Sequence, residues 1–437
     1  MNTRQANSAD NYLGAYRRIS EILPGHHLPW LQQARSEAIE RFARRGFPTL
    51  RDENWKYTSV AGIEQSRYNV LPAPCPYQLA SQVASHALPG AHLLVFVNGQ
   101  LEPGLSSPGH LPPGATLSSL AYWLEGHPDE LERSLISTDT TSAFADLNLA
   151  FASDGAYLHL APQTRVEAPI QLLFMASEAN LAIQHRSVIL AAAGSSACII
   201  EQHVALDDSA YLTNAQTSIA IDAAAEIEHL LLQQESPAAS HIAGLHVQQQ
   251  ANSRFVSASH ALGSRLARVD IAIALQGEGA SCDLDGLYLG SARQHLDHHT
   301  CVDHRQPGGT SRQLYKGVLS GAARGVFNGR IVVHADAQRS DATQTNRNLL
   351  LSENTEIDSK PQLEIWADDV KCSHAATVGQ LDEEQLFYLR SRGIGLASAR
   401  SLLSRAFARE MIDRVRLPVL QERLDALLQE KLGAMAC

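Results

Sequence analysis

The sequence predicts a mostly β protein, in which a parallel β-helix (β-solenoid) core is flanked by α-helical regions at both ends. Three observations support this prediction. The middle of the chain, from about residue 150 to 378, alternates apolar and polar residues with almost no helical periodicity. Short clusters of small or polar residues interrupt it at intervals of about 30 residues. Helical periodicity is concentrated before residue 47 and after residue 379.

Residues 1–90 are expected to form an N-terminal helical region and a connector. Leu31 and Phe42 fall on one face at helical spacing, together with other apolar residues between them. Pro29 stands where a helix would begin and Gly46 where it would end. The connector that follows contains the sequence ENWKYTSV and a proline-rich stretch.

Residues 91–378 are expected to form the β-helix, less regular up to about residue 150. The interruptions that suggest a repeat are Gly194-Ser195-Ser196, Ala223-Ala224-Ala225, Ala251-Asn252-Ser253, Gly277-Glu278-Gly279, Gly321-Ala322-Ala323 and Ser352-Glu353-Asn354. Their first residues are 29, 28, 26, 44 and 31 positions apart, and a β-type run follows each. In a solenoid each coil buries its inward residues against its neighbours. A large β-sandwich is the competing architecture, since it produces similar alternation without a period.

Residues 379–437 are expected to form a C-terminal helical domain. Asp382 followed three residues later by Gln385 resembles a capping box, and Gly393 stands where a helix C-cap belongs. Two further amphipathic stripes follow. Such stripes usually pack within their own chain, and the alternative is a docking face for another protein.

Composition narrows the classes of function. A net charge of −11 argues against a nucleic-acid groove, which needs clustered lysine and arginine. No apolar run approaches the length of a membrane span, and the N-terminus lacks a secretory signal pattern. The six cysteines (75, 198, 282, 301, 372 and 437) form no CxxC pair, which favours free thiols in a reducing cytoplasm. We therefore expect a cytoplasmic protein.

The pair Cys372-x-His374 is the strongest candidate for a chemical role. Side chains at i and i+2 of a strand point to the same face, so the thiol and the imidazole should lie side by side. This combination suits a soft metal or a sulfur carrier. Two donors cannot complete a tetrahedral site, so a metal here would be transient or shared with a partner chain. The alternative is a buried cysteine beside a capping histidine.

A second candidate is the run HLDHHTCVDH at 295–304. Alternation places His299, Cys301 and Asp303 on one face of a strand, with His298, Thr300, Val302 and His304 on the other. The first set would suit a mononuclear metal site, and hence a metal-dependent enzyme.

The sequence contains no GxSxG, HExxH or P-loop motif in a suitable context, so energy from ATP would have to come from a partner.

Two segments resemble the SufB/SufD family of iron–sulfur cluster assembly proteins, and its SufD branch most closely. They are ENWKYTSV (53–60) and the run from DHHTCVDHRQPGG to YLRSRGI (297–394), and the helical tail that follows is also similar. The resemblance implies a right-handed parallel β-helix between helical regions. It also implies a non-catalytic scaffold subunit that contributes to iron acquisition and to formation of a nascent cluster.

The resemblance further implies partners and site residues. A SufB-like sister chain would pair with the β-helix, and the cluster would form at their junction, with His374 tied to assembly and Cys372 as a neighbouring thiol. In isolation, a homodimer is the alternative to this pairing. A SufC-like ABC-type ATPase would bind the C-terminal helices, and reduced flavin is associated with such complexes as a whole. The candidate ATPase-binding residues are Arg390, Arg392, Leu402, Leu403 and Phe407. A purely structural adaptor that recruits an ATPase is the remaining alternative.

Overall fold

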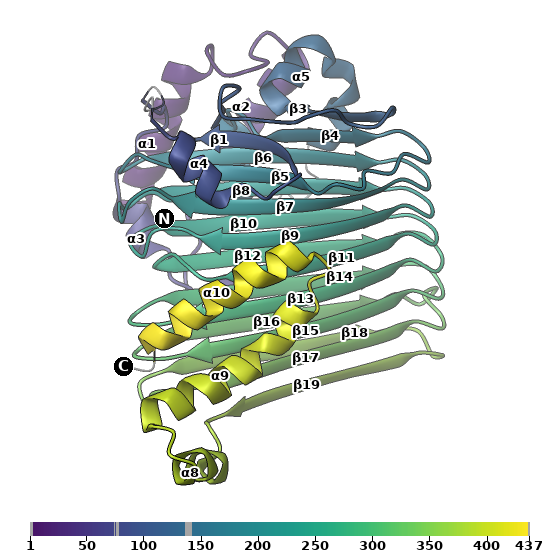
Figure 1. Cartoon of the computed structure of the whole chain (residues 1–437). Helices are drawn as coiled ribbons and strands as arrows, with labels where there is room; N and C mark the ends of the chain where they lie inside the picture. Colours follow the sequence, from purple (N-terminus) through teal and green to yellow (C-terminus); the bar gives the residue numbers. More distant parts are fainter. Residues whose placement is uncertain (1–2, 74, 76–77, 136–141, 436–437) are drawn as a thin grey trace.

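Two long β-sheets that face each other dominate the computed structural model, which describes residues 3–73, 75, 78–135 and 142–435 (Figure 1). One sheet has ten strands in the order β19-β17-β15-β13-β11-β9-β7-β5-β1-β2, and the other has nine in the order β18-β16-β14-β12-β10-β8-β6-β4-β3. From β4 onward, neighbours in each sheet are two strands apart along the chain, so the chain passes alternately from one sheet to the other. From β5 onward neighbouring strands are parallel, as for example β5 with β7 and β17 with β19. This confirms the predicted parallel β-solenoid, and the β-sandwich alternative is wrong.

The strands of the solenoid are mostly ten residues long. The ten-stranded sheet contains β1 (His92–Val97), β2 (Gln100–Leu101), β5 (Ile170–Ala176), β7 (Ser196–Ala205), β9 (Glu226–Gln234), β11 (Arg254–Ala261), β13 (Ser281–Gly290), β15 (Thr310–Leu319), β17 (Asp341–Leu350) and β19 (Lys371–Gly379). The nine-stranded sheet contains β3 (Ala115–Ser119), β4 (Ala156–Leu160), β6 (Ala182–Ala191), β8 (Leu212–Ile221), β10 (Ser240–Gln249), β12 (Leu266–Leu275), β14 (His295–His304), β16 (Arg324–Val333) and β18 (Glu356–Ile365).

The tight corners between strands explain both the period and its one irregular interval. At the edge where the chain leaves the nine-stranded sheet, a residue with positive φ recurs in successive coils. These residues are Gly194, Ala224, Asn252, Gly279, Gly308 and Arg339. Each donates its backbone N–H to a carbonyl of the next coil, as from Gly194 to Ala223 at 3.0 Å. The interval of 44 residues separates Gly277 from Gly321. It is irregular because Gly321, like Ser352, lies at the opposite edge of the solenoid, where the chain enters the nine-stranded sheet.

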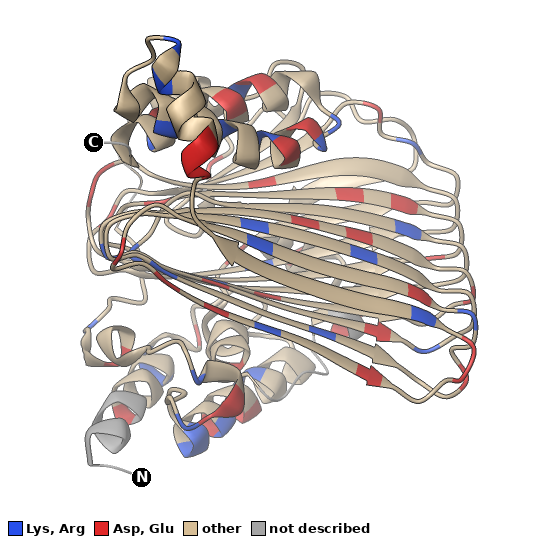
Figure 2. Ribbon diagram, turned by 90° about the horizontal axis from the view of Figure 1, so that it is seen from below, with Lys and Arg blue, Asp and Glu red and all other residues tan. Residues whose placement is uncertain are grey.

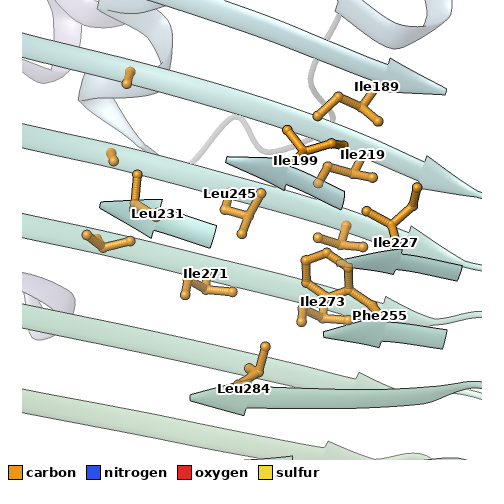
Figure 3. Packing of buried hydrophobic residues seen from close by; sticks show 14 of the residues in the cluster. Ile189, Ile199, Ile219, Ile227, Leu231, Leu245, Phe255, Ile271, Ile273 and Leu284 are labelled. Carbon is orange, nitrogen blue, oxygen red and sulfur yellow. The ribbon is translucent and has the colours of Figure 1, made fainter. Parts of the chain in front are cut away.

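The main core lies between the two sheets (Figure 3). Alternate residues of each strand point inward, so Ile199, Ile227 and Phe255 of one sheet meet Ile219 and Ile271 of the other. All are at most 3% exposed. Burial of this apolar surface, at about 25 cal/mol per Å², is the main force that holds the coils together.

Most N-terminal helices cover the outer face of the nine-stranded sheet, on the side opposite the C-terminal helices (Figure 2), whereas α4 packs on the ten-stranded sheet. The helices before the solenoid are α1 (Thr3–Ile19), α2 (Pro29–Arg45), η1 (Glu53–Trp55), α3 (Ala61–Gln65), α4 (Ala80–His86), α5 (Leu120–Gly126), η2 (Pro128–Glu130), α6 (Glu132–Leu135) and α7 (Ala143–Phe151). As the sequence predicts, α2 begins at Pro29 and is capped by Gly46. Its Phe42 packs with Phe144 of α7 against Leu212 and Ile242 of the sheet.

Three helices follow the solenoid: α8 (Glu383–Ser391), α9 (Leu396–Asp413) and α10 (Pro418–Met435). The Asp382 side chain accepts hydrogen bonds from the N–H groups of Glu384 and Gln385, so the predicted N-cap is confirmed. Helices α9 and α10 lie across the outer face of the ten-stranded sheet (Figure 1). Their apolar stripes, which include Met411 and Leu424, are therefore packed within the chain.

Two negative findings apply to the residues that the structure describes. None of their helices is long and apolar enough to cross a membrane. Among Cys75, Cys198, Cys282, Cys301 and Cys372, which all lie in the described ranges, there is no disulfide, and Cys437 lies outside them.

Candidate functional site

Cys372 and His374 lie on β19, the last strand of the ten-stranded sheet (Figure 1). In the parallel pairing of β17 with β19, Cys372 is the partner of Ala342 and His374 the partner of Gln344. Ala342 and Gln344 are buried on the inward face of their coil. Cys372 and His374 therefore share the inward face of the last coil, as i and i+2 spacing predicts. His374 is exposed and Cys372 is half-buried, because no further coil covers them.

The last coil is an open end of the solenoid. Strands β18 and β19 each pair with one neighbour and stand at the end of their sheets. Trp366 is 58% exposed, Val378 53% and Ile365 39%. Unpaired strand edges next to exposed apolar side chains mark a surface on which another chain can add strands.

Burial alters the chemistry of the Cys372 thiol. Burial raises its pKa, while a backbone hydrogen bond at Ala342 opposes the rise and the Asp341 carboxylate adds to it. At neutral pH this thiol is therefore protonated, and it becomes a strong ligand only when a metal or a positive partner group displaces the proton.

The histidine run at 295–304 forms β14 and shows the predicted alternation, with His298 and His304 inward and His299 and Cys301 outward. His299 Nε2 lies 3.1 Å from Asp297 Oδ1, and Arg268 binds the other carboxylate oxygen of Asp297 at 2.9 Å. In the parts of the chain that the structure describes, no three His, Cys, Asp or Glu side chains are arranged to hold a metal ion. The run therefore belongs to an ion-pair network.

This network joins the connector to the solenoid, a contact that sequence reasoning missed. The Trp55 ring lies 3.8 Å from the Arg268 guanidinium carbon, and the Thr58 hydroxyl donates to Asp297 at 2.5 Å. Burial alone would raise the pKa of Asp297, but His299 and Arg268 hold it well below its usual range. The one indication of this contact in the sequence is that segments 53–60 and 297–394, which contain Thr58 and Asp297, both resemble the same family.

The C-terminal helices present a second exposed surface. Phe387 and Tyr388 of α8 are 73% and 57% exposed, and Leu402 of α9 is 52% exposed. Phe387, Tyr388 and Leu403 line one groove beside the acidic start of α8. We call these four residues the α8 surface. The predicted binding residues did not include Phe387 and Tyr388. Four consecutive apolar residues at 386–389 cannot all face one side of a helix, so the sequence already indicated that some of them are exposed.

The predicted ATPase-binding residues divide between exposed and inward positions. Arg390 and Arg392 are exposed at the end of α8, and the Arg392 guanidinium lies 5.2 Å from the Tyr388 ring. Phe407, in contrast, packs toward the solenoid. The Lys316 ammonium lies 4.5 Å from its ring and donates to its backbone carbonyl at 2.9 Å. Phe407 therefore anchors α9 to β15.

The chain is therefore a parallel β-solenoid protein whose open end carries two potential metal ligands and whose C-terminal helices leave an exposed surface. The family model described as the SufBD core domain of the SUF system for FeS cluster assembly matches residues 174–407. The model of the SufBD N-terminal region matches residues 6–172. The chain belongs to the SufBD family of iron–sulfur cluster assembly proteins, as its resemblance predicted.

Individual relatives align over most of their length. The iron–sulfur cluster assembly protein SufD of Escherichia coli is 32% identical over 431 residues, which cover 97% of this chain and 98% of that protein. A SufBD family protein of Synechocystis is 32% identical over 407 residues, 90% of this chain and 89% of that protein. The chloroplastic protein ABCI7 of Arabidopsis thaliana is 30% identical over 409 residues, 90% of this chain and 84% of the relative.

Proposed function

We propose that this protein is a non-catalytic scaffold subunit of an iron–sulfur cluster assembly complex. The observation that carries the proposal is the position of His374 and Cys372 on the inward face of an uncovered last coil. Two donors at an open end form half of a site, and the remaining ligands must come from a second chain. Iron and sulfur are then cargo that is assembled at this end and released.

The second chain is a SufB-like sister of the same fold. A sister solenoid can add its own terminal strands to the free edges of β18 and β19 by backbone hydrogen bonds. Trp366, Ile365 and Val378 supply apolar area around the seam. This pairing encloses His374 and Cys372 between the two chains, where water is excluded and metal–ligand bonds are stronger.

The two donors suit transient binding. A neutral imidazole is a ligand of intermediate strength for iron, and it is released more easily than a thiolate. Cys372 keeps its proton until a metal arrives, because burial raises its pKa. His374 therefore contributes to iron acquisition, while Cys372 is an auxiliary thiol beside it. Electrons for the reaction come from another component of the complex, for which reduced flavin is the candidate.

The energy source is a SufC-like ABC-type ATPase that docks on the α8 surface. Exposed aromatic residues are typical anchors of protein interfaces, and Phe387 and Tyr388 are such residues. Helix α8 follows β19 directly, so a force on α8 reaches the terminal coil through the short link 380–382. ATP-driven movement of the docked ATPases would then open and close the seam.

The experiment that tests this function is reconstitution of the complex with His374→Ala. The variant should assemble with its partners but lose cluster formation, measured by the growth of visible absorbance after supply of iron, sulfide donor, reductant and ATP. His110→Ala, which removes an exposed imidazole elsewhere, is the matched control and should keep full activity. Full activity of His374→Ala would refute the assignment and leave the chain as an adaptor that recruits an ATPase.

A further inference from the structure

A column of polar side chains inside the solenoid leads to His374. Gln313 of β15, Gln344 of β17 and His374 of β19 are register partners in successive coils, so their side chains stack on the inward face. The Thr300 hydroxyl, from the opposite sheet, donates to Gln313 Oε1 at 2.7 Å. Gln344 Nε2 donates to the same oxygen at 3.4 Å. These contacts fix which end of the Gln344 amide faces Gln313.

The other end of that amide is unused. Among the described residues, Gln344 Oε1 has no hydrogen-bond partner, although Gln344 is only 1% exposed. A buried acceptor without a donor is unfavourable, and such groups in native proteins call for an explanation. The space for this amide is provided by Gly329 across the interior, since a Cβ there would lie 1.6 Å from Gln344 Nε2. The site is therefore shaped around a glutamine.

We propose that Gln344 is a positioning residue for His374, and that its Oε1 accepts a hydrogen bond from one ring nitrogen of His374. The hydrogen bond that Gln344 Oε1 lacks is then supplied by the next residue in the same register. Histidines that bind metals commonly donate their second ring N–H to a carbonyl or carboxylate, which fixes the tautomer and the ring orientation. The other nitrogen then keeps its lone pair and points out of the open end. This inference rests on the proposed role of His374 as an iron ligand.

The test compares Gln344→Leu with the wild-type full-length chain. In NMR spectra of the chain with 15N-labelled histidine, the His374 ring should show one dominant tautomer, and its signals are identified by their loss in His374→Ala. Gln344→Leu should shift the ring to a mixture of tautomers, and Gln344→Glu, which restores an acceptor, should reverse the shift. Gln344→Met is the substitute if the leucine variant does not fold.

The second readout is cluster formation in the reconstituted complex. Loss of a residue that orients a metal ligand commonly costs about 10-fold to 100-fold in metal affinity or activity, so Gln344→Leu should slow assembly by about that factor. The matched control is Gln249→Leu, which removes a buried amide from β10, several coils away, and should leave both readouts unchanged.

The outcomes separate this inference from the proposed function. If His374→Ala abolishes assembly while Gln344→Leu matches the wild type in tautomer and rate, Gln344 has no positioning role. If His374→Ala is fully active, the proposed function itself fails. A tautomer change together with slower assembly in Gln344→Leu, both reversed in Gln344→Glu, would establish the role.

Discussion

At the scale of single residues, the corners of the solenoid depend on a left-handed backbone conformation. Gly308 and Ala224 occupy equivalent corners with φ of 69° and 57°. A side chain costs about 1–2 kcal/mol in this region, and glycine avoids that cost. Alanine at 224 is held in this conformation by the next coil, where the Ala251 carbonyl accepts its backbone N–H at 2.9 Å.

This difference predicts opposite effects of two substitutions. Gly308→Ala should destabilise the chain by about 1 kcal/mol, since the new Cβ would make only ordinary contact with the Gly279 backbone, at 3.8 Å, and the cost comes from the backbone conformation. Ala224→Gly should be neutral or stabilising by up to about 1 kcal/mol. Thermal denaturation midpoints measure both. Gly104→Ala, at an exposed glycine without positive φ, is the control, and a loss of stability in Ala224→Gly would contradict the argument.

Buried histidines make the fold sensitive to mild acid. Inside the solenoid His298 stacks on Tyr288 at a ring distance of 5.2 Å and packs at a tilt against Tyr315 at 5.5 Å. Burial lowers its pKa to about 4, against about 6.5 in an unfolded chain. At a pH between these two pKa values, His298 binds a proton in the unfolded state but not in the folded state. Stability should therefore fall as the pH drops from about 6.5 to 4.

The expected contribution of His298 is about 3 kcal/mol by pH 4, because one pKa unit corresponds to about 1.4 kcal/mol. His298→Phe should remove this part of the pH dependence, and the measurement is the urea midpoint at pH 7.5, 6 and 5. His110→Phe, at an exposed position, should leave the slope unchanged. Equal slopes in wild type and His298→Phe would show that the imidazole is not held neutral.

At the scale of elements, the C-terminal helices divide into a packed pair and an exposed unit. Lys316 of β15 binds Glu410 at 2.5 Å and the Phe407 carbonyl, and Arg414 binds Asp285 at 2.7 Å. These partly buried ion pairs tie α9 to the solenoid. Helix α8 has one buried residue, Leu386, and turns its aromatic side chains to solvent.

We therefore predict that the double variant Phe387→Ala and Tyr388→Ala loses most ATPase binding without losing stability. Large interface aromatics commonly contribute about 2 kcal/mol or more each, which corresponds to a roughly 30-fold weaker complex per residue. Binding is measured by titration calorimetry with the purified ATPase subunit. Tyr122→Ala removes an equally exposed aromatic residue from α5 and should bind normally. Unchanged affinity in the double variant would exclude the α8 surface.

At the scale of the whole molecule, the solenoid is asymmetric. Its first coils are covered by helices on both outer faces and by the strand pairs β1–β2 and β3–β4, whereas its last coil ends in free edges (Figures 1 and 2). An uncovered solenoid end tends to associate with other chains, which is why terminal coils are usually capped. The open end is therefore where we propose that the sister chain binds.

Changes at this end should weaken association and spare the fold. Val378→Lys combined with Trp366→Ala should reduce pairing with the sister chain by at least about tenfold, since a charge faces an apolar seam and an anchor is lost. The thermal midpoint of the isolated chain should change little. Leu50→Lys, at an equally exposed apolar residue of the connector, is the matched control. Light scattering measures the association, and pairing as strong as in the wild type would place the interface elsewhere.

The fold was largely predictable because it depends on local and repeated patterns. Alternation placed residues such as His298 and His299 on opposite faces of β14 correctly, and the period near 30 indicated stacked coils. The corner series was predicted imperfectly, because Gly308 and Arg339 were overlooked and Gly321 and Ser352, which belong to the opposite edge, were counted in the same series. Composition alone cannot distinguish the two edges, since both need small or polar residues.

The amino-acid sequence by itself determined the strand periodicity, the helical ends and the shared face of Cys372 and His374, because these follow from backbone geometry over a few residues. Only the tertiary structure decided that this face is uncovered, that Gln344 stands beneath His374, and that Phe387 rather than Phe407 faces solvent. Those facts depend on which distant segments pack together, and contacts between residues far apart in the chain leave no local pattern.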